Sequence, residues 1–150
     1  MSMALDLHAA LSSNYLMRDL DPRQISEVAA LAATKEFGGG ETLVRQFAKD
    51  ADLMIVLEGR AKIKSFSGEE IAEAGPGSVI GEMSLIDDKP RSATVTAAGP
   101  VTVALISNSA LWGLMDREPE VGKTILLNVG RILAARLRAA NVALDSVVER

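Results

Sequence analysis

SATVTAAGPVTVALIS, residues 92–107, contains two consecutive runs in which apolar or small residues alternate with polar ones. In the first run Ala93, Val95 and Ala97 lie on one side of an extended chain, and the residues between them lie on the other. The second run, VTVALIS, repeats the alternation. This period of two predicts a pair of short strands, each with one buried face.

Four more strand-length segments precede this pair. Each is bounded by Gly, Asp or Ser-Gly, and together they occupy residues 41 to 75: ETLVRQ, LMIVLEG, RAKIKSF and EEIAEAG. Many short strands in close succession are typical of a small sandwich or a jelly-roll barrel. The β-core is therefore expected at about residues 32–106.

Helices are expected on both sides of this core. Asp21-Pro22, with Gln24 at the third helical position, predicts a helix start with an aspartate N-cap. After residue 106, Asn108 or Ser109 is expected to cap a short helix that ends near Pro119. The last thirty residues predict one long helix, so the C-terminal helices are expected at about 107–149.

The long helix carries an apolar stripe with steps of three or four residues. The stripe holds Leu126, Val129, Leu133, Leu137, Ala140, Leu144 and Val147, and the opposite side holds Asn128, Arg131, Arg138, Asn141 and Asp145. Such a stripe packs back on the β-core or pairs with a second copy of the chain as a short coiled coil. Both interpretations stay open, so a homodimer through this helix is one prediction.

Composition restricts the classes of function. The chain has 150 residues, which predicts a single domain over 1–150, and it has no cysteine and one histidine, His8. These counts leave little material for thiolate or imidazole catalysis or for a metal site, so we expect no catalytic residue, no metal and no enzyme. A formal charge of −4 with 3% aromatic residues disfavours direct DNA binding. With neither a signal peptide nor a membrane span in the sequence, a cytoplasmic protein is expected.

Residues 75–94, GPGSVIGEMSLIDDKPRSAT, form the longest irregular segment inside the expected β-core. Gly81 permits an unusual φ, and Glu82 to Ile86 can form one or two helical turns whose first N–H groups attract an anion. Arg91 follows Pro90, and its guanidinium can bind two phosphate oxygens at once. The Glu82 carboxylate is a strong acceptor for sugar hydroxyl groups. One phosphate and one free ribose hydroxyl would satisfy both side chains, which describes a cyclic nucleotide.

The segment G-E-M-S-L-I-x-x-x-P-R-S-A-T resembles the phosphate-binding cassette of the cyclic nucleotide-binding domain family. That family includes catabolite-activator-type regulators, regulatory subunits of cyclic-AMP-dependent kinase and cyclic-nucleotide-gated channels. The resemblance extends to V-L-E-G at 56–59, to G-P-G at 75–77 and to the helix, β-barrel, helix-helix order over roughly 15–145. It implies an α+β, mainly β, fold: an eight-stranded jelly-roll barrel with N-terminal helices and a C-terminal pair of one short and one long helix.

The resemblance also implies roles for particular residues. Arg91 and Ser92 would bind the phosphate, Glu82 would accept from the ribose 2′-OH, and Gly81 would let the sugar approach. The N–H groups of Met83 and Ser84 would complete the phosphate cradle, and Ala93 would lie beside Ser92. Ile63 and Ala72 would form apolar walls for the base or the ribose. Family members close the pocket with a residue from the C-terminal helix, for which Arg131 or Asn128 is available here.

The resulting prediction is a sensor that binds cyclic AMP more readily than cyclic GMP and needs no cofactor. Nucleotide would fix the 81–92 loop, and the helices after residue 107 would repack. No output domain is visible in the sequence, so an unknown effector protein is the expected partner, and no membrane is expected. Three alternatives stay open: a scaffold of the same fold that no longer binds nucleotide, the regulatory part of a DNA-binding regulator, and a β-barrel enzyme that acts on a phosphorylated small molecule.

Overall fold

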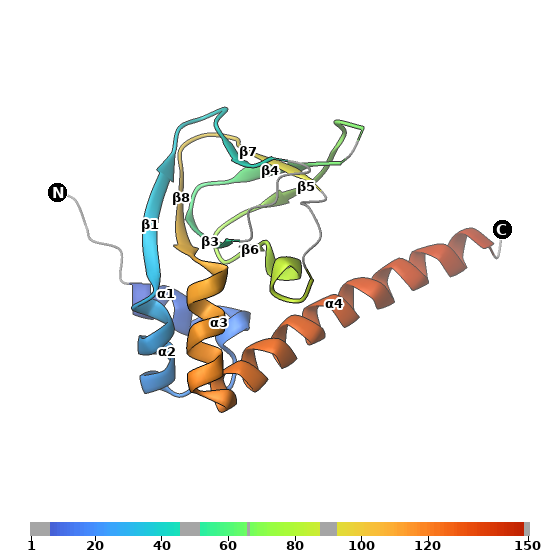
Figure 1. Ribbon diagram of the computed structural model, residues 1–150. Coiled ribbons are helices and arrows are strands. Elements are labelled where there is room, and N and C mark those ends of the chain that lie inside the picture. Colours follow the sequence, from blue (N-terminus) through green and yellow to red (C-terminus); the bar gives the residue numbers. More distant parts are fainter. Residues whose placement is uncertain (1–6, 46–51, 66, 88–92, 149–150) are drawn as a thin grey trace.

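Helices lie at one end of a two-sheet β-region in the computed structural model, which describes residues 7–45, 52–65, 67–87 and 93–148, with the backbone alone for 143–148 (Figure 1). The N-terminal helices are α1 (Leu7–Ser12), the 3-10 helix η1 (Tyr15–Met17) and α2 (Pro22–Ala29). The 3-10 helix η2 (Glu82–Leu85) lies within the β-region, and α3 (Asn108–Arg117) and α4 (Pro119–Val148) follow it.

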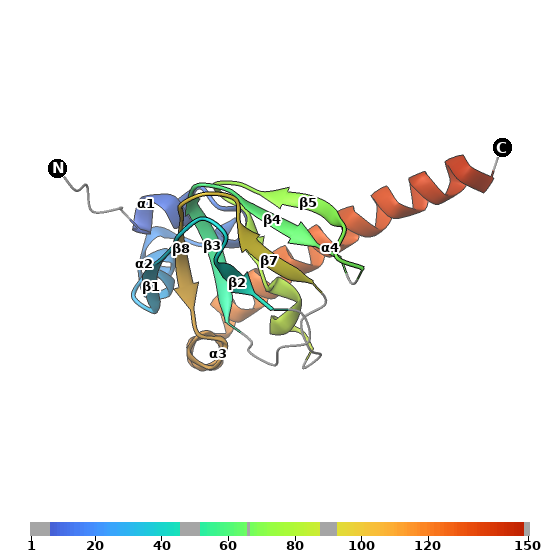
Figure 2. The ribbon, with the colours of Figure 1, turned by 90° about the horizontal axis from the view of Figure 1, so that it is seen from above.

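The described strands form two four-stranded antiparallel sheets. One sheet has the order β1 (Ala32–Phe37), β8 (Val101–Ile106), β3 (Leu53–Glu58), β6 (Val79–Ile80). The other has the order β2 (Thr42–Val44), β7 (Thr94–Ala97), β4 (Ala61–Lys64), β5 (Glu70–Ala74), and Figure 2 shows the strands from above. The expected mixture of helices and antiparallel strands is confirmed, while closure of the sheets into a jelly-roll barrel stays a prediction.

Strand β3 is apolar on both faces because it separates two cores. Leu53 and Ile55 pack with the helices, whereas Met54 and Val56 pack between the two sheets. Strand β7 has one buried face, so Val95 and Ala97 are buried whereas Thr94 and Thr96 are half-buried. The alternation that the sequence shows at 93–97 therefore corresponds to a sheet with a single core face.

Two of the described strands were not predicted from the alternation of apolar and polar residues. Strand β1, AATKEF, is mostly exposed and, among the described strands, pairs with β8 alone, so it lacks the apolar alternation that marks a half-buried strand. Strand β6 has two residues, which pair with β3 inside the segment that the sequence indicated as irregular. The prediction of an irregular stretch over 75–94 was wrong at Val79 and Ile80, because two residues are too few to show a period.

The helix starts follow the expected chemistry with one shift. At α2 the Asp21 side chain accepts from the Gln24 N–H and the Gln24 side chain accepts from the Asp21 N–H, which confirms the predicted cap. At α3 the cap is Ser107, whose Oγ accepts from the Ala110 N–H at 3.3 Å, so the assignment to Asn108 or Ser109 was wrong. Ser107 has the extended φ/ψ that an N-cap requires, while Asn108 is already helical.

The junction of α3 and α4 is a sharp corner. Glu118 adopts non-helical φ/ψ before Pro119, and Pro119 begins α4. A Cβ on Gly122 would lie 3.0 Å from the Cβ of Met115, so the glycine allows the two helices to approach closely. Helix α4 then runs past η1 and the β-region and projects beyond them (Figure 1).

The buried face of α4 coincides in part with the expected apolar stripe, since Val129 is buried and Leu133 is partly buried against the helical core. Val121, Ile125 and Val129 are fully buried, and Asn128 is buried with them at 2% exposure. Leu137, which the sequence pattern assigned to the packed stripe, is 63% exposed. The prediction that Asn128 lies on the solvated side was therefore wrong, because its polar groups bond to backbone carbonyls of the N-terminal segment.

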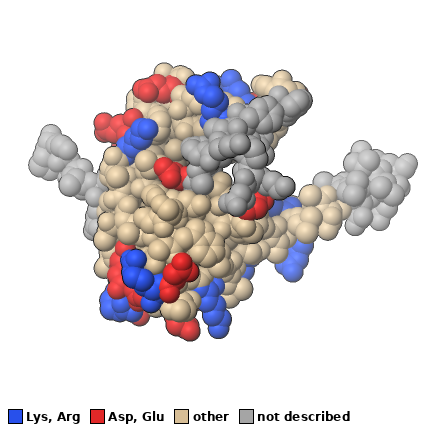
Figure 3. Space-filling view, in the orientation of Figure 1, with Lys and Arg blue, Asp and Glu red and all other residues tan. Residues whose placement is uncertain are grey.

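Charged side chains gather at the end of the molecule formed by α2 and α3 (Figure 3). There Arg23 of α2 pairs with Glu27 and with Glu118, at 2.6 and 3.1 Å. Ion pairs with this much solvent contact contribute little to stability. They mark a solvated surface and not a candidate site.

Candidate functional site

The turn that opens η2 has the geometry that the sequence predicted. Gly81 precedes the helix with φ at +92°, a value that favours glycine, and Glu82 to Leu85 form the short helix. The Ser84 N–H donates to the Gly81 carbonyl at 3.1 Å and closes the turn. Leu85 is buried, whereas Met83 is 49% exposed. This arrangement directs Glu82 inward and leaves Met83 at the surface.

Glu82 is a buried carboxylate with a cation beside it. Its side chain is 5% exposed and accepts, through Oε1, from Nη1 of Arg136 on α4. Burying a carboxylate is costly unless a partner compensates its charge. The ion pair therefore connects the cassette turn to a helix that begins more than thirty residues later.

Tyr15 of η1 lies in the electrostatic field of the same pair. Burial first, and the Glu82 carboxylate second, raise the pKa of Tyr15 to about 12, while Arg136 acts in the opposite direction. The phenol is thus neutral at physiological pH. Three elements, η1, η2 and α4, meet at Tyr15, Glu82 and Arg136.

Segment η1 is fastened on two sides by buried asparagines. Asn14 donates to the Gly77 carbonyl at 2.8 Å, and its Oδ1 accepts from the Leu16 N–H. Asn128 of α4 donates to the carbonyls of Leu16 and Arg18 at 2.9 and 2.8 Å. The N-terminal segment therefore contacts both the turn before β6 and the first half of α4.

Arg131 belongs to this fastening. Its Nη1 donates to Oδ1 of Asn128 at 2.8 Å and lies 3.4 Å from a carboxylate oxygen of Asp19. Within the described residues, the α4 side chain paired with the cassette is Arg136 and not Arg131 or Asn128. Closure of a ligand site by Arg131 stays a prediction.

The other expected ligand residues lie on the η2 turn, on β4 and β5, and just before β7. Gly81, Glu82, Met83 and Ser84 form the η2 turn, and Ile63 of β4 stands opposite Ala72 of β5 in the ladder. Ala93 is half-buried just before β7. Arg91 and Ser92 lie outside the described residues, so the phosphate contacts assigned to them stay predictions.

The sequence reading overlooked Arg136 and Tyr15. One signal was available for Arg136: Val121, Ile125, Val129 and position 136 continue one helical face, because 129 and 136 are seven residues apart. Arg136 is the first charged residue on that face. Tyr15 carried no such signal, since its position beside Glu82 depends on the tertiary fold.

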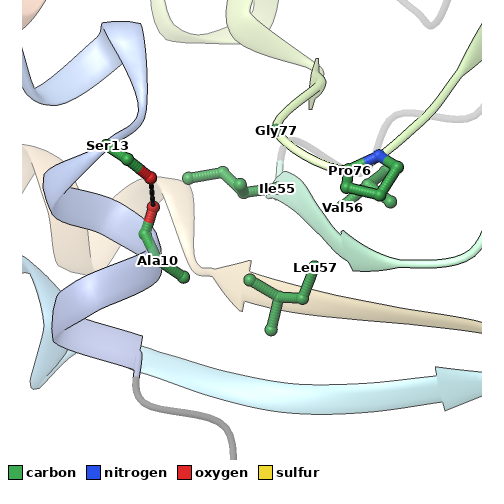
Figure 4. Close-up of a pocket in the computed structure, with 7 residues that line it drawn as sticks. All are labelled: Ala10, Ser13, Ile55, Val56, Leu57, Pro76 and Gly77. Carbon is green, nitrogen blue, oxygen red and sulfur yellow. Dashed lines mark hydrogen bonds between the residues drawn. The ribbon is translucent and has the colours of Figure 1, made fainter.

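A separate cavity of about 350 Å³ lies between α1 and β3 (Figure 4). Ala10 and Ser13 line one side, where the Ser13 hydroxyl donates to the Ala10 carbonyl at 3.1 Å, and Ile55 to Leu57 with Pro76 and Gly77 line the other. None of its lining residues is charged, and none is an expected ligand residue. Its one polar side chain is Ser13, whose hydroxyl already donates to the Ala10 carbonyl.

In the part of the chain that the structure describes, no group of three or more acidic or histidine side chains could hold a metal ion. Of the described helices, none has the length and apolar character to cross a bilayer.

Comparison with known proteins gives a consistent result. The family model for the cyclic nucleotide-binding domain matches residues 34–118. The N-terminal domain of a transcriptional regulator from Streptomyces coelicolor A3(2) superposes with a TM-score of 0.74 at 33% identity, over 90% of this chain and 94% of that one.

Curated relatives are longer than this chain. A CRP-like cAMP-activated global transcriptional regulator of Mycobacterium tuberculosis is 26% identical over 89% of this chain and 59% of its own length. Glutaminase 2 of Bradyrhizobium diazoefficiens is 30% identical over 90% of this chain but only 22% of its own length. The chain thus spans between about a fifth and three fifths of these relatives.

Proposed function

This chain belongs to the cyclic nucleotide-binding domain family, and we propose that it is a sensor that binds cyclic AMP through the cassette at 81–94. The observation that carries the proposal is the buried Glu82 carboxylate behind the left-handed turn at Gly81, inside the matched region. A buried acceptor of this kind suits a ligand hydroxyl, because it satisfies the carboxylate with a donor in place of water.

The proposed contacts divide between sugar and phosphate. Glu82 accepts from the ribose 2′-OH, and the turn at Gly81 leaves room for the sugar. Arg91 and Ser92 bind the phosphate, since a guanidinium and a hydroxyl are suitable donors for its oxygens. Ile63 and Ala72, opposite each other in the sheet, supply apolar contacts.

Cyclic AMP is proposed over cyclic GMP for two reasons. Ser92 resembles the residue of bacterial cyclic-AMP receptors, whereas a threonine at this place is associated with guanine selectivity in some relatives. The Mycobacterium tuberculosis relative, a cAMP-activated regulator, also supports this choice.

The proposed mechanism is a population shift within a single domain that catalyses nothing. Nucleotide stabilises one arrangement of the cassette, and the helices after residue 107 repack in response, which an effector protein in the cytoplasm reads. The stabilisation of the folded state follows the ligand concentration and reaches about 2.7 kcal/mol at a hundredfold excess over Kd.

Calorimetric titration of the denatured, refolded and nucleotide-free protein tests the proposal. Cyclic AMP is expected to bind saturably with one site per chain, cyclic GMP more weakly, and Arg91→Ala to abolish the binding. Arg138→Ala is the matched control, because it removes an exposed arginine of α4 far along the sequence from the cassette.

Other outcomes point to other functions. A folded protein that gives no heat with either nucleotide, and whose thermal denaturation ignores both, would be a scaffold of the same fold. Retardation of DNA at low salt would favour a DNA-binding regulator, and slow loss of the nucleotide during incubation would favour an enzyme.

A homodimer through α4 is a second proposal, supported by its exposed apolar side chains. Leu127, Leu137 and Val142 are 50%, 63% and 68% exposed on a helix that projects from the body of the molecule (Figure 1). Pairing with a second copy would cover them. Light scattering of the purified chain should then give twice the monomer mass, and Leu137→Lys should reduce it to the monomer mass.

A further inference from the structure

Asn14 is a buried polar side chain that forms hydrogen bonds in two directions. Its Oδ1 accepts from the Leu16 N–H at 2.9 Å and caps η1, while its Nδ2 donates to the Gly77 carbonyl at 2.8 Å. The first bond is local, whereas the second joins residues 63 positions apart. Serine or aspartate would cap a helix about as well as asparagine, so capping alone does not explain a side chain that also donates.

The Gly77 carbonyl belongs to a tight turn that is bonded within itself and to β3. The Ser78 N–H donates to the Gly75 carbonyl, and the Ser78 Oγ accepts from the Gly75 N–H, at 2.9 and 3.1 Å. Val56 of β3 donates to the Ser78 carbonyl and accepts from the Gly77 N–H, at 2.9 and 2.8 Å. Gly77 has φ at +90°, a value that favours glycine. Asn14 adds a second attachment of this turn, from the side of η1.

The same turn leads directly to Glu82. The two residues of β6 follow it and pair with β3, and Gly81 and Glu82 come next along the chain. A strand of two residues forms few hydrogen bonds of its own, so its position depends on the turn that precedes it. Because Glu82 is buried, a small shift of the turn changes where its carboxylate lies.

Apolar contacts of η1 reach the same part of the chain. Leu16 of η1 belongs to the same buried cluster as Val79 of β6 and Leu85 of η2. Burial, and after it the Glu82 carboxylate, raises the pKa of Tyr15, so this neighbour of Asn14 lies in the field of the cassette. Segment η1 thus meets residues 77–85 along its length, and the amide of Asn14 supplies a polar part of that contact.

We propose that Asn14 is a positioning residue for Glu82: its amide fixes the turn at 75–78, and the turn, through β6, sets where the carboxylate meets a ligand hydroxyl. The ligand in this inference rests on the proposed function. A site that is held in its binding geometry costs less to order when the ligand arrives. Affinity for the nucleotide therefore depends on an N-terminal residue that lies outside the cassette.

Calorimetric titration with cyclic AMP tests the dependence. Asn14→Ser keeps a side chain that caps η1 but is too short to reach the Gly77 carbonyl. It should bind about fivefold or more weakly than the parent, because a buried carbonyl loses its donor. Asn141→Ser is the same exchange at an exposed position, and Ile25→Ala destabilises the helical core away from the turn. Both controls should bind as the parent does, and equal affinity of the folded Asn14→Ser variant would overturn the proposal.

Asn14→Asp separates the donor from the cap by means of pH. An ionised carboxylate caps η1 but cannot donate to the Gly77 carbonyl, whereas the protonated acid can. Burial favours the protonated form, so the loss of affinity relative to the parent should be large at about pH 8 and should shrink toward about pH 5. Tyr15, Glu82 and Arg136 are present in both proteins, so their own titration cancels in the ratio of affinities. A ratio that does not change with pH would overturn the role of the amide.

Amide hydrogen exchange tests the contact without nucleotide. The N–H groups of Val56 and Gly77 join β3 to the turn, and they should exchange about fivefold faster in Asn14→Ser than in the parent and in Asn141→Ser. If no protein binds nucleotide, the proposed function fails, and the exchange rates still decide whether Asn14 holds the turn. Unchanged rates in a variant that circular dichroism shows to be folded would overturn the inference.

Discussion

The two halves of α4 are continuous in backbone but differ in what covers them. Val121, Ile125 and Val129 are fully buried and pack with α3, η1 and the β-region. Leu137 and Val142, by contrast, are exposed to solvent. Propensity and hydrogen bonding make both halves helical, but only the first has a tertiary partner over its apolar face. Helix α4 is thus continuous in its backbone but has one half whose side chains are packed and one half whose described side chains are exposed. Arg136 lies near the boundary between them.

The largest effect on stability is expected from truncating a buried side chain in the first half of α4. Ile125→Ala should lower the free energy of unfolding by about 2–5 kcal/mol, because it opens a cavity among the helices. Leu137→Ala in the second half should change it by no more than about 0.5 kcal/mol. Urea denaturation followed by circular dichroism measures both, and equal losses would contradict the division of the helix.

The second largest loss in free energy of unfolding is expected at Asn128, which anchors the first half of α4 through polar contacts. Asn128→Ala leaves the carbonyls of Leu16 and Arg18 without their donor and should cost about 1–3 kcal/mol. Asn141→Ala, on the exposed second half, is the matched control and should have little effect. A cost below that of Asn141→Ala would show that water replaces Asn128 at those carbonyls.

A substitution at Gly130, between the two halves of α4, should raise the free energy of unfolding instead of lowering it. Gly130→Ala meets no neighbour within 4 Å and should raise the free energy of unfolding by about 0.4–1 kcal/mol. In a variant that carries spin labels on Ile86→Cys and Val142→Cys, Gly130→Ala should also narrow the distance distribution between the labels if Gly130 is where the second half moves. Destabilisation would mean that the glycine has a packing role in solution.

The smallest expected effect is on the titration of the Tyr15 phenol, where η1, η2 and α4 meet. The pKa of Tyr15 is raised to about 12, so stability from this group is complete below about pH 10, the ordinary tyrosine value, and is lost as the pH rises through about 12. Arg136→Gln removes the influence that lowers the pKa, so the phenol should titrate at still higher pH. The chain has one tyrosine, and its phenolate absorbance reports this titration directly. A lower pKa in Arg136→Gln would place the arginine away from Tyr15.

Much of the fold was visible in the sequence where the signal is local. The capping box at Asp21 and Gln24, the alternation at Val95 and Ala97, and the αL turn at Gly81 each depend on residues within four positions of one another. The cassette resemblance likewise lies within one segment, and the family comparison confirms it. Strands β1 and β6 were overlooked because an exposed edge and a two-residue strand leave no period to detect.

The register of α4 shows the opposite case. Its sequence contains more apolar positions than one face can bury, so Leu126, Val129, Leu133 and Leu137 formed an acceptable stripe. The structure keeps Val129 of that stripe but buries Val121 and Ile125 with it, and Asn128 beside them donates to the Leu16 carbonyl of η1. Periodicity alone does not distinguish these faces.

Local signals in the sequence established the class of fold and the capped start of α2, and they predicted the chemistry of the cassette, since these depend on neighbouring residues and on side-chain type. Only the tertiary structure decided that Arg136, and not Arg131 or Asn128, meets Glu82, and that Tyr15 joins them. The physical reason is that a buried carboxylate is compensated by whichever donor the packing of distant elements brings within reach, and that packing is a property of the whole chain.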